Sequence, residues 1–406
     1  MAGECLSWRK ADKARPIGLR SRLDLDNIAL RAALIGGRQH MTLRLARHRF
    51  HPLHVPYVRP IRWAGHIELG VDILLLVLET DTGLTGVGET PIRLNWHAAT
   101  LKSLMTVIEE VFIPQMGNLN LEDENAVKGF LGAFKEHPLA KGLIDTACWD
   151  LRARAAGVPL WQRLGATEAN VPISWTVTRA APQDMAREAE TAAVKYGVRA
   201  FKVKTGQGFA ADRTALQEIR RAVGDNADLF ADSNAADRAA DVPEMSELLA
   251  DFGVILFEDP CNFAPNDEFR TIRKSSQLPI LVDNGCRSVA EAGLFLGVGA
   301  EALSVKVMKT GITESRVIAQ MAQKRQARVA VGISATTSLG AMTALALSAS
   351  LPAEARCAPC EETFFATMQE ILIEPLQIKD GSVQLPATCG YEPLVDWNKV
   401  TSLRAA

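Results

Sequence analysis

The feature that most constrains the fold of this chain is a regular alternation of short apolar runs and amphipathic helical stretches after residue 171. Each run has four to six residues, and a stretch of helical period separates it from the next. Repeated strand-then-helix units of this length predict parallel strands joined by crossover helices, and seven or eight such units can close into a barrel. The runs are residues 172–177, 200–203, 227–231, 254–257, 279–282, 302–305 and 328–331.

The chain before these runs has a different pattern. Residues 41–90 are strand-like, whereas residues 98–165 have a helical period, and this order predicts a separate α+β domain. Residues 1–40 are rich in Arg and have no clear period, so we expect an extension, either disordered or packed loosely on the surface. We therefore divide the chain into the extension 1–40, a capping domain 41–170, a barrel 171–365 and a C-terminal segment 366–406 that returns to the capping domain.

Consecutive apolar runs end in charged residues. The series is Lys204, Asp232, Glu258, Asp283 and Lys306, at intervals of 28, 26, 25 and 23 residues. One charged residue per strand-helix unit places all of them at the same end of the strands, which in a barrel is the C-terminal face where catalytic residues lie. Lys202 precedes Lys204 by two residues on the same strand, so both side chains point to one face.

These residue types in this order predict a metal site flanked by proton-transfer groups. Three converging carboxylates, Asp232, Glu258 and Asp283, repel one another unless a cation lies between them, and their oxygen atoms favour Mg²⁺ or Mn²⁺. The lysines on the strands before and after would flank that cation, and we expect their pKa values to fall so that they can act as acid or base. A cation that binds a substrate carboxylate can stabilise the enediolate formed when the α-proton leaves.

Composition argues against several other classes of protein. A formal net charge of −2 over 406 residues gives no reason to expect the basic face that nucleic-acid binding needs. The longest apolar run, residues 73–78, is far below the roughly 20 residues of a membrane helix. Seven cysteines and a start without the order of a secretory signal argue against a secreted, disulfide-linked protein. We therefore expect a cytoplasmic protein, a homo-oligomer, that acts on a small-molecule carboxylate with no nucleic-acid or membrane partner.

Six motifs occur together in this chain: Phe201-Lys-Val-Lys204, Ala231-Asp-Ser-Asn234, Phe257-Glu-Asp-Pro260, Val282-Asp-Asn284, Val305-Lys-Val-Met-Lys-Thr-Gly311 and Ile144-Asp-Thr-Ala-Cys-Trp-Asp-Leu151. Over roughly residues 41–400 their combination resembles the enolase superfamily, and within it the muconate lactonizing enzyme subgroup. The resemblance implies a modified TIM barrel of the (β/α)7β type with an N-terminal α+β capping domain. It also implies Lys204 and Lys306 as acid/base lysines, Lys202 as an electrostatic helper, and Asp232, Glu258 and Asp283 as metal ligands.

Three segments are similar to those of muconate cycloisomerases. Ile173-Ser-Trp-Thr176 resembles their first barrel strand, Arg59-Pro-Ile-Arg-Trp-Ala64 their substrate-covering loop, and Glu361-Glu-Thr-Phe364 the end of their eighth strand. The leading interpretation is therefore a cycloisomerase-like lyase or isomerase of a small carboxylate. The substrate contacts that this interpretation predicts are Trp175, Asn234, Glu362 and Arg62.

Other reactions stay open. A racemase or epimerase of an amino-acid derivative or dipeptide would use Lys204 and Lys306 on opposite faces of the substrate, although the Asp-x-Asp by which dipeptide epimerases hold an α-ammonium group is not visible. A dehydratase could use the same site.

The chain also departs from the subgroup at Asn284, where Glu is usual, and at residues 335–337, where a Glu is common. All seven histidines precede the barrel, which excludes the late barrel histidine that mandelate racemase-like enzymes use as a base. A silent binding protein would not need the intact lysines and carboxylates.

Overall fold

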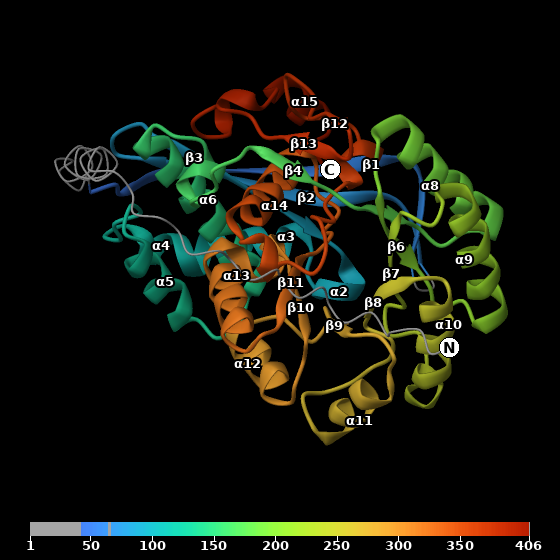
Figure 1. The fold of residues 1–406 in the computed structure, drawn as a ribbon. Helices are drawn as coiled ribbons and strands as arrows, with labels where there is room; N and C mark the ends of the chain where they lie inside the picture. The colour runs from blue at the N-terminus through green and yellow to red at the C-terminus, as the bar shows by residue number, and fades with distance from the viewer. Residues whose placement is uncertain (1–41, 64–65, 406) are drawn as a thin grey trace, which may run out of the picture. The chain divides into compact units, whose positions relative to one another are not determined.

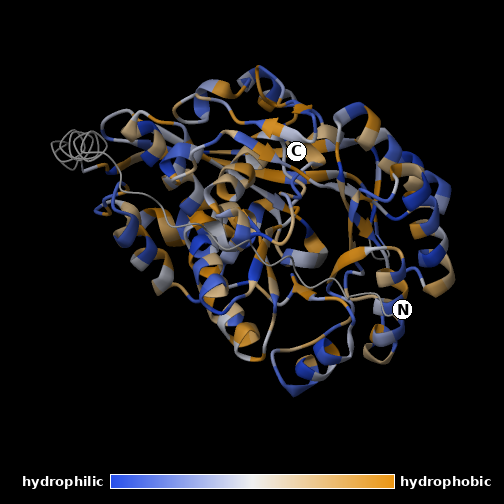
Figure 2. Cartoon of the chain, in the orientation of Figure 1, coloured by the Kyte–Doolittle hydropathy of each residue, from blue (hydrophilic) through white to orange (hydrophobic). Residues whose placement is uncertain are grey.

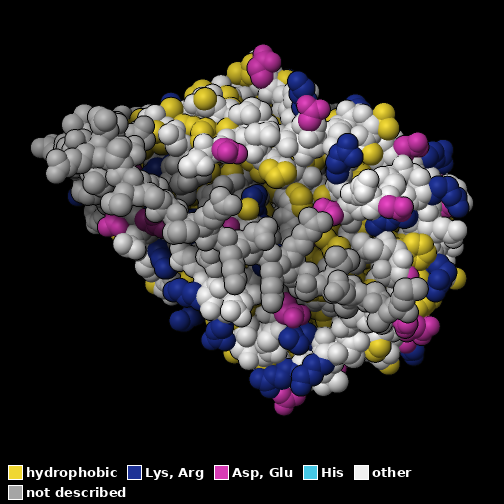
Figure 3. All heavy atoms as spheres, viewed as in Figure 1, with side chains coloured by type: hydrophobic (Ala, Val, Ile, Leu, Met, Phe, Trp, Pro, Cys, Tyr) yellow, Lys and Arg dark blue, Asp and Glu magenta, His cyan; other side chains and the backbone are white. Residues whose placement is uncertain are grey.

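The computed structural model describes residues 42–63 and 66–405. The extension expected at residues 1–40 lies outside these residues. Among the described residues, no helix is both long enough and apolar enough to cross a membrane. On the face that Figure 3 shows, Lys and Arg side chains lie among Asp and Glu side chains over the described part of the chain.

The seven apolar runs form one parallel sheet whose strands are neighbours in chain order. They are β5 (Trp175–Val177), β6 (Ala200–Lys204), β7 (Asp228–Asp232), β8 (Val254–Glu258), β9 (Ile280–Val282), β10 (Ala302–Val305) and β11 (Arg328–Val331). A helix follows each strand and lies outside the sheet (Figure 1). These helices are α8 (Pro182–Tyr196), α9 (Phe209–Val223), α10 (Val242–Asp251), α11 (Asp267–Ser275), α12 (Val289–Gly297), α13 (Val307–Lys324) and α14 (Ser338–Ser350).

A segment without regular strand geometry, residues 356–361, closes the sheet into a barrel. On one side its backbone N–H groups donate to the carbonyl oxygens of Val329 and Val331 in β11, both at 3.0 Å. On the other side, the N–H of Cys360 donates to the carbonyl oxygen of Pro172 at 3.2 Å, just before β5. This segment therefore takes the eighth position in the ring, and the expected (β/α)7β barrel is confirmed.

The barrel helices bury one face against the strands. In α9, Ala215, Leu216 and Ile219 are buried, with the three- and four-residue spacing of a helix face. Figure 2 shows hydrophobic residues on strands of the barrel and a mixture of hydrophilic and hydrophobic residues on the surrounding helices. Each fully buried Leu or Ile side chain of this kind stabilises the fold by roughly 1.5–3 kcal/mol.

The N-terminal half consists of three antiparallel strands followed by helices, the order that the sequence predicts. The strands are β1 (Leu45–Trp63), β2 (His66–Thr80) and β3 (Thr85–Ile92), in the order β1-β2-β3. The helices are α2 (Leu94–His97), α3 (Leu101–Val107), η1 (Ile108–Phe112), α4 (Ile113–Met116), α5 (Glu124–Ala133), α6 (Pro138–Ala156) and α7 (Leu160–Arg163). Helix α6 packs so closely on β3 that a Cβ on Gly88 would lie 2.6 Å from the Leu143 carbonyl oxygen, so only glycine fits there.

Buried carboxylates join this half to the barrel helices. Glu89 in β3 accepts backbone N–H groups of Thr337 (2.8 Å) and Gly340 (3.1 Å) at the N-terminus of α14. Asp145 in α6 accepts the backbone N–H of Thr313 in α13 at 2.8 Å. A negative charge is favourable at a helix N-terminus, where N–H groups lack partners within the helix. These contacts fix the strands and helices of the N-terminal half over one end of the barrel.

The ionisation of Glu89 makes a testable contribution to stability. Burial raises the pKa of its carboxyl group from 4.5 to about 7, although hydrogen bonds from Thr337 and Gly340 oppose the rise. A raised carboxyl pKa contributes stability that is full below the unfolded pKa and is lost as the pH rises through the folded pKa. The free energy of unfolding of the wild type, relative to Glu89→Gln, should therefore fall from about pH 4.5 to about pH 7, by at most roughly 1.4 kcal/mol per pH unit. Urea unfolding of both proteins across this range measures the difference, and a pH-independent difference would contradict the assignment.

The C-terminal segment forms a small sheet and then contacts β1. Strands β12 (Ile378–Lys379) and β13 (Ser382–Gln384) pair with β4 (Asn170–Pro172). After α15 (Trp397–Ser402), the carbonyl oxygen of Leu403 accepts the N–H of His54 in β1 at 2.9 Å. The remaining short helices are η2 (Ala239–Asp241), η3 (Ala353–Ala355), η4 (Phe364–Thr367) and η5 (Glu392–Leu394). The domain boundaries at residues 170 and 365 stay predictions.

Candidate active site

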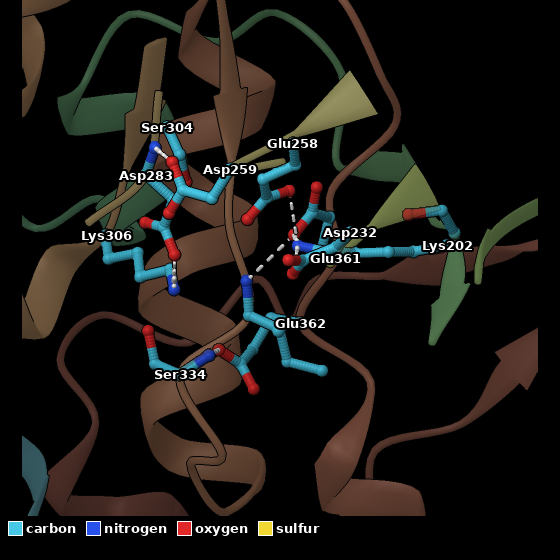
Figure 4. Close-up of polar contacts among 12 residues, drawn as sticks. Lys202, Asp232, Glu258, Asp259, Asp283, Ser304, Lys306, Ser334, Glu361 and Glu362 are labelled. Carbon is cyan, nitrogen blue, oxygen red and sulfur yellow. Dashed lines mark hydrogen bonds and ion pairs between the residues drawn. The ribbon is translucent and has the colours of Figure 1, made fainter. Parts of the chain in front are cut away.

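The barrel strands bring the predicted charged residues together at one end (Figure 4). The parallel register places Lys204 beside Asp232 and Asp232 beside Glu258 across β6, β7 and β8. Asp283 directly follows β9, and Lys306 directly follows β10. All five side chains are buried. They therefore form one cluster at the carboxyl ends of the strands, the face where barrel enzymes have their active sites.

The Lys202 ammonium group lies among three carboxylates. Its Nζ is 2.6 Å from Glu258 Oε2, 2.8 Å from Glu361 Oε2 and 3.3 Å from Asp232 Oδ2. Burial lowers the pKa of Lys202, but the charges of Glu258, Glu361 and Asp232 raise this pKa more, to well above its usual value. Lys202 is therefore a permanent cation that offsets part of the negative charge of the cluster.

Lys204 and Lys306 lie on opposite walls of the barrel. Lys204 Nζ is 2.5 Å from Asp232 Oδ2, and Lys306 Nζ is 2.6 Å from Asp283 Oδ2. Seven strands and the closing segment give eight positions around the ring, and β6 and β10 are four positions apart. The two ammonium groups thus face the space above the carboxylates from opposite sides.

The fall in the lysine pKa values was expected beside a bound cation and stays a prediction; among the residues of the chain alone, the pKa of Lys204 is lowered and the pKa values of Lys306 and Lys202 are raised. Burial and the nearby Lys202 ammonium group together lower the pKa of Lys204, against the raising effect of Asp232. At Lys306, burial lowers the pKa, but the charges of Asp283 and Glu258 and the hydrogen bond to Asp283 together raise it more.

Three of the carboxylates have the chemistry of ligands for a divalent cation. Asp232, Glu258 and Asp283 are at most 5% exposed. Among the described residues, none donates a hydrogen bond to Glu258 Oε1, and burial raises the pKa of Glu258 well above its usual value. In the described ranges, no three His, Cys, Asp or Glu side chains are arranged as a complete metal cluster. Asp232 and Asp283 contact lysines. The buried oxygen donors nevertheless fit a hard cation, which would relieve their mutual repulsion.

Two residues predicted as substrate contacts, Asn234 and Glu362, form hydrogen bonds with other parts of the site. The backbone N–H of Asn234 donates to Asp232 Oδ1 at 2.8 Å, and its side-chain amide lies 3.3 Å from Asp232 Oδ2. Glu362 accepts the backbone N–H of Ser334 at 2.7 Å, and burial raises the pKa of Glu362 to about 7. Asn234 therefore orients Asp232. Glu362 holds the loop after β11, through Ser334 (Figure 4).

The other two residues predicted as substrate contacts, Trp175 and Arg62, have their contacts elsewhere than at Lys204 and Lys306. Trp175 is the register partner of Phe201, on the outer face of the strands, where its ring stacks on Tyr196 of α8 and its indole N–H donates to Glu188 at 3.2 Å. Arg62 is exposed on β1, opposite Ile67 of β2. The placement of Trp175 follows from the two-residue period of a strand, because its neighbour Thr176 shares the inward face of Lys202.

The structure adds three residues to the cluster that the sequence analysis did not select. Glu361 contacts Lys202, as described above. Lys309 Nζ lies 2.9 Å from Asp283 Oδ1, and Asp259 accepts the backbone N–H of Asp283 at 3.0 Å. Two of these have a signal in the sequence, because Asp259 directly follows Glu258 and Lys309 lies one helical turn after Lys306. Only the backbone path of the closing segment reveals that Glu361, and not Glu362, points toward Lys202.

A cavity of about 830 Å³ opens beside Lys306. The Trp96 ring borders it, with its centre 5.9 Å from Lys306 Nζ, and His97 lines it as well. The backbone N–H of Arg93 donates to His97 Nδ1 at 3.1 Å, and burial lowers the pKa of His97 to about 4. His97 is therefore neutral at pH 7 and can donate from Nε2 only. The volume is in the range of pockets that enclose a small organic molecule.

Comparison with protein families gives two matches along the chain. Residues 51–165 match the model of the mandelate racemase/muconate lactonizing enzyme N-terminal domain. Residues 184–393 match the model described as enolase C-terminal domain-like. The second match alone spans more than half of the 406 residues. The resemblance found in the sequence motifs is thereby confirmed.

Comparison with known proteins gives relatives of more than one activity. A hydrophobic dipeptide epimerase from Enterococcus faecalis is 30% identical over 291 residues, which cover 70% of this chain and 81% of the relative. Muconate cycloisomerase 1-2 from Acinetobacter lwoffii is 25% identical over 359 residues, covering 86% and 92%. The solved structure of a dipeptide epimerase from Cytophaga hutchinsonii, complexed with Mg and the dipeptide D-Ala-L-Val, has a TM-score of 0.79 at 21% identity and covers 90% of this chain and 99% of that one. At that identity the structural likeness concerns the fold.

Proposed function

This chain belongs to the mandelate racemase/muconate lactonizing enzyme family of the enolase superfamily and is an isomerase, and from this premise we propose that it racemises or epimerises an amino-acid derivative or dipeptide. The observation that carries the proposal is the position of Lys204 and Lys306 on opposite walls, with the carboxylates between them. Inverting a carbon centre requires one base and one acid on opposite sides of it. Two buried lysines meet that requirement.

In the proposed reaction each lysine serves one enantiomer. Lys204, neutral in its base form, takes the α-proton from one face of the substrate, and Lys306 in its ammonium form returns a proton to the other face. The roles reverse for the opposite enantiomer. The lowered pKa of Lys204 favours its base form, and the raised pKa of Lys306 favours its acid form. Lys202 stays charged and stabilises the negative charge that develops on the substrate carboxylate.

We propose Mg²⁺ as the cofactor, with Mn²⁺ as a substitute, held by Asp232, Glu258 and Asp283. A bound divalent cation supplies positive charge beside the substrate carboxylate and so makes the α-proton more acidic. Support comes from the burial of the three carboxylates, from the lack of a donor to Glu258 Oε1 among the described residues, and from the Mg in the related epimerase structure. A homo-oligomer and a cytoplasmic location stay predictions.

A cycloisomerase is the second candidate, favoured by the Acinetobacter relative, which this chain matches over 92% of its length. Two of the sequence features that had supported it contribute nothing near the lysines. Trp175 packs against α8, and Arg59 forms an ion pair with Glu188 and donates to Thr178 at 3.2 Å. The proposal therefore favours proton exchange at a carbon between two lysines over ring closure.

Incubation in D₂O tests the proposal. With Mg²⁺ present, we expect solvent deuterium at the α-carbon of at least one member of a panel of N-acyl amino acids and dipeptides, together with formation of the opposite stereoisomer. Treatment with EDTA should abolish the exchange, and added Mg²⁺ should restore it, because the substrate carboxylate then regains its cationic partner. Mass spectrometry and chiral chromatography measure both products. Turnover of a muconate-type diacid without exchange in any panel member would contradict the proposal and favour the second candidate.

A further inference from the structure

A buried arginine lies beside the strand ends without taking part in the charged cluster. Arg179 follows β5 by two residues and is 9% exposed. Its Nε–H donates to the carbonyl oxygen of Thr205 at 2.7 Å, and its Nη2 donates to the carbonyl oxygen of Ser233 at 2.8 Å. Within the described ranges, no carboxylate oxygen lies within ion-pair distance of this guanidinium group. Its hydrogen bonds go to backbone oxygens alone.

Each of the two carbonyl groups that accept from Arg179 belongs to a residue that directly follows a charged residue of the site. Thr205 directly follows Lys204, and Ser233 directly follows Asp232. The guanidinium group therefore joins the ends of β6 and β7 at the point where each strand has just presented its charged side chain. It is planar and rigid, so two bonds from one group fix the distance between the two turns.

Further contacts lock the same two turns together. The N–H of Thr205 donates to the carbonyl oxygen of Asp232 at 3.0 Å, and the hydroxyl groups of Thr205 and Ser233 lie 3.0 Å apart. Gly206 has a φ of +79°, and a Cβ there would lie 2.9 Å from Arg179 Nη2. The backbone thus passes close around the guanidinium group, and a shift of Arg179 would move the residues after Lys204 and Asp232.

The burial of this group is costly. Burial lowers the pKa of Arg179, while the charges of Asp232, Asp212 and Asp237 at longer range oppose this. A buried cation with only carbonyl partners is expensive, and a neutral side chain could fill the same space at a lower cost. What a neutral side chain could not provide is a rigid pair of donors aimed at two adjacent strand ends.

We propose that Arg179 is a positioning residue that sets the placement of Lys204 and Asp232 relative to each other through the backbone of Thr205 and Ser233. It acts on one wall of the site only, because Lys306 and Asp283 lie on β10 and β9, away from its contacts. The expected effect of Arg179 on proton exchange rests on the proposed function. Its expected effect on metal binding does not.

The test uses Arg179→Met with Arg220→Met as the matched control. Arg220 also donates to backbone oxygens of neighbouring units, to Ala227 at 2.8 Å and Phe252 at 2.7 Å, but at the amino ends of β7 and β8. Both variants remove a guanidinium group that bridges two units through backbone oxygens. Only the first acts at the end of the strands that carries the charged cluster. Arg179→Lys is a further variant, which keeps the charge but cannot span both carbonyl oxygens.

The first arm measures proton exchange in D₂O from each enantiomer of the substrate that the wild type exchanges fastest. Lys204→Ala identifies the enantiomer that depends on Lys204. At Mg²⁺ concentrations that saturate both the wild type and the variant, we expect Arg179→Met to lower kcat for that enantiomer by about 10-fold or more with little change in KM. Exchange from the other enantiomer and both rates of Arg220→Met should stay near wild type. Arg179→Lys should recover part of the loss. Equal slowing of both enantiomers would mean a general structural role and overturn the proposal.

The second arm measures Mn²⁺ binding by electron paramagnetic resonance. We expect Arg179→Met to weaken Mn²⁺ binding by about 10-fold or more because Asp232 is displaced, and Arg220→Met to leave it unchanged. If the wild type exchanges no proton, the proposed function fails and this arm alone decides the role of Arg179. Unchanged Mn²⁺ affinity in Arg179→Met would overturn the proposal. If that variant does not fold, the same comparison is made with Arg179→Lys, for which a smaller loss of the same sign is expected.

Discussion

Replacing Lys204 by alanine should lower proton exchange from one enantiomer of the substrate by about 10²- to 10⁴-fold, while exchange from the other enantiomer persists. The reason is that a positioned base accelerates proton transfer by this amount, and Lys204 is a buried lysine at the end of β6, on one wall of the site. Lys306→Ala should lower exchange from the other enantiomer, while exchange from the enantiomer that depends on Lys204 persists. Isotope incorporation into each recovered enantiomer, followed by mass spectrometry, measures both rates.

The pair of variants contains its own control. Each should lose net racemisation, because inversion needs both lysines, but each should keep exchange on one face only. If both variants lost exchange from the same enantiomer, the two lysines would act on one face and the proposed inversion would be wrong. Circular dichroism should stay close to wild type in both variants, which separates loss of the base from loss of the fold.

Replacing Lys202 by methionine should destabilise the protein by about 3–5 kcal/mol, the cost of leaving buried charges without their partner. Lys202 Nζ lies within 3.3 Å of Glu258, Glu361 and Asp232, and its side chain is fully buried. Methionine has a similar length but no charge, so three carboxylates would face one another with less compensation. Urea unfolding in EDTA measures the loss without a contribution from bound metal.

Two further variants make this prediction specific. Lys324→Met changes an exposed lysine in α13 and should alter the free energy of unfolding by no more than about 0.5 kcal/mol. The double variant Lys202→Met/Glu361→Gln removes one of the three negative charges and should recover part of the loss, as a double-mutant cycle measures. A loss below about 1 kcal/mol in Lys202→Met would show that the carboxylates do not depend on this cation.

The intervals between charged residues predicted the centre of the site, because a repeated strand-helix unit delivers each strand end to the same face. Lys204, Asp232, Glu258, Asp283 and Lys306 lie together for that reason, and no detail of side-chain packing was needed. The same reasoning could not predict how Asn234, Glu362 and Trp175 are held, since each has a polar or aromatic side chain that can face either a substrate or its own backbone surroundings. As substrate contacts they stay predictions. Asn234 holds Asp232, Glu362 holds the backbone of Ser334, and Trp175 packs on α8.

The sequence by itself determined the seven strands of the barrel, the helices between them, and the set of acidic and basic residues at the strand ends. These follow from local periodicity and spacing, which are properties of the sequence and do not depend on contacts between distant residues. Only the tertiary structure decided which of Glu361 and Glu362 reaches Lys202, how Arg179 joins the ends of β6 and β7, and how α2 places Trp96 and His97 beside Lys306. Those contacts link residues far apart in the chain, and their geometry depends on the closure of the barrel and on the packing of the N-terminal strands and helices over its mouth.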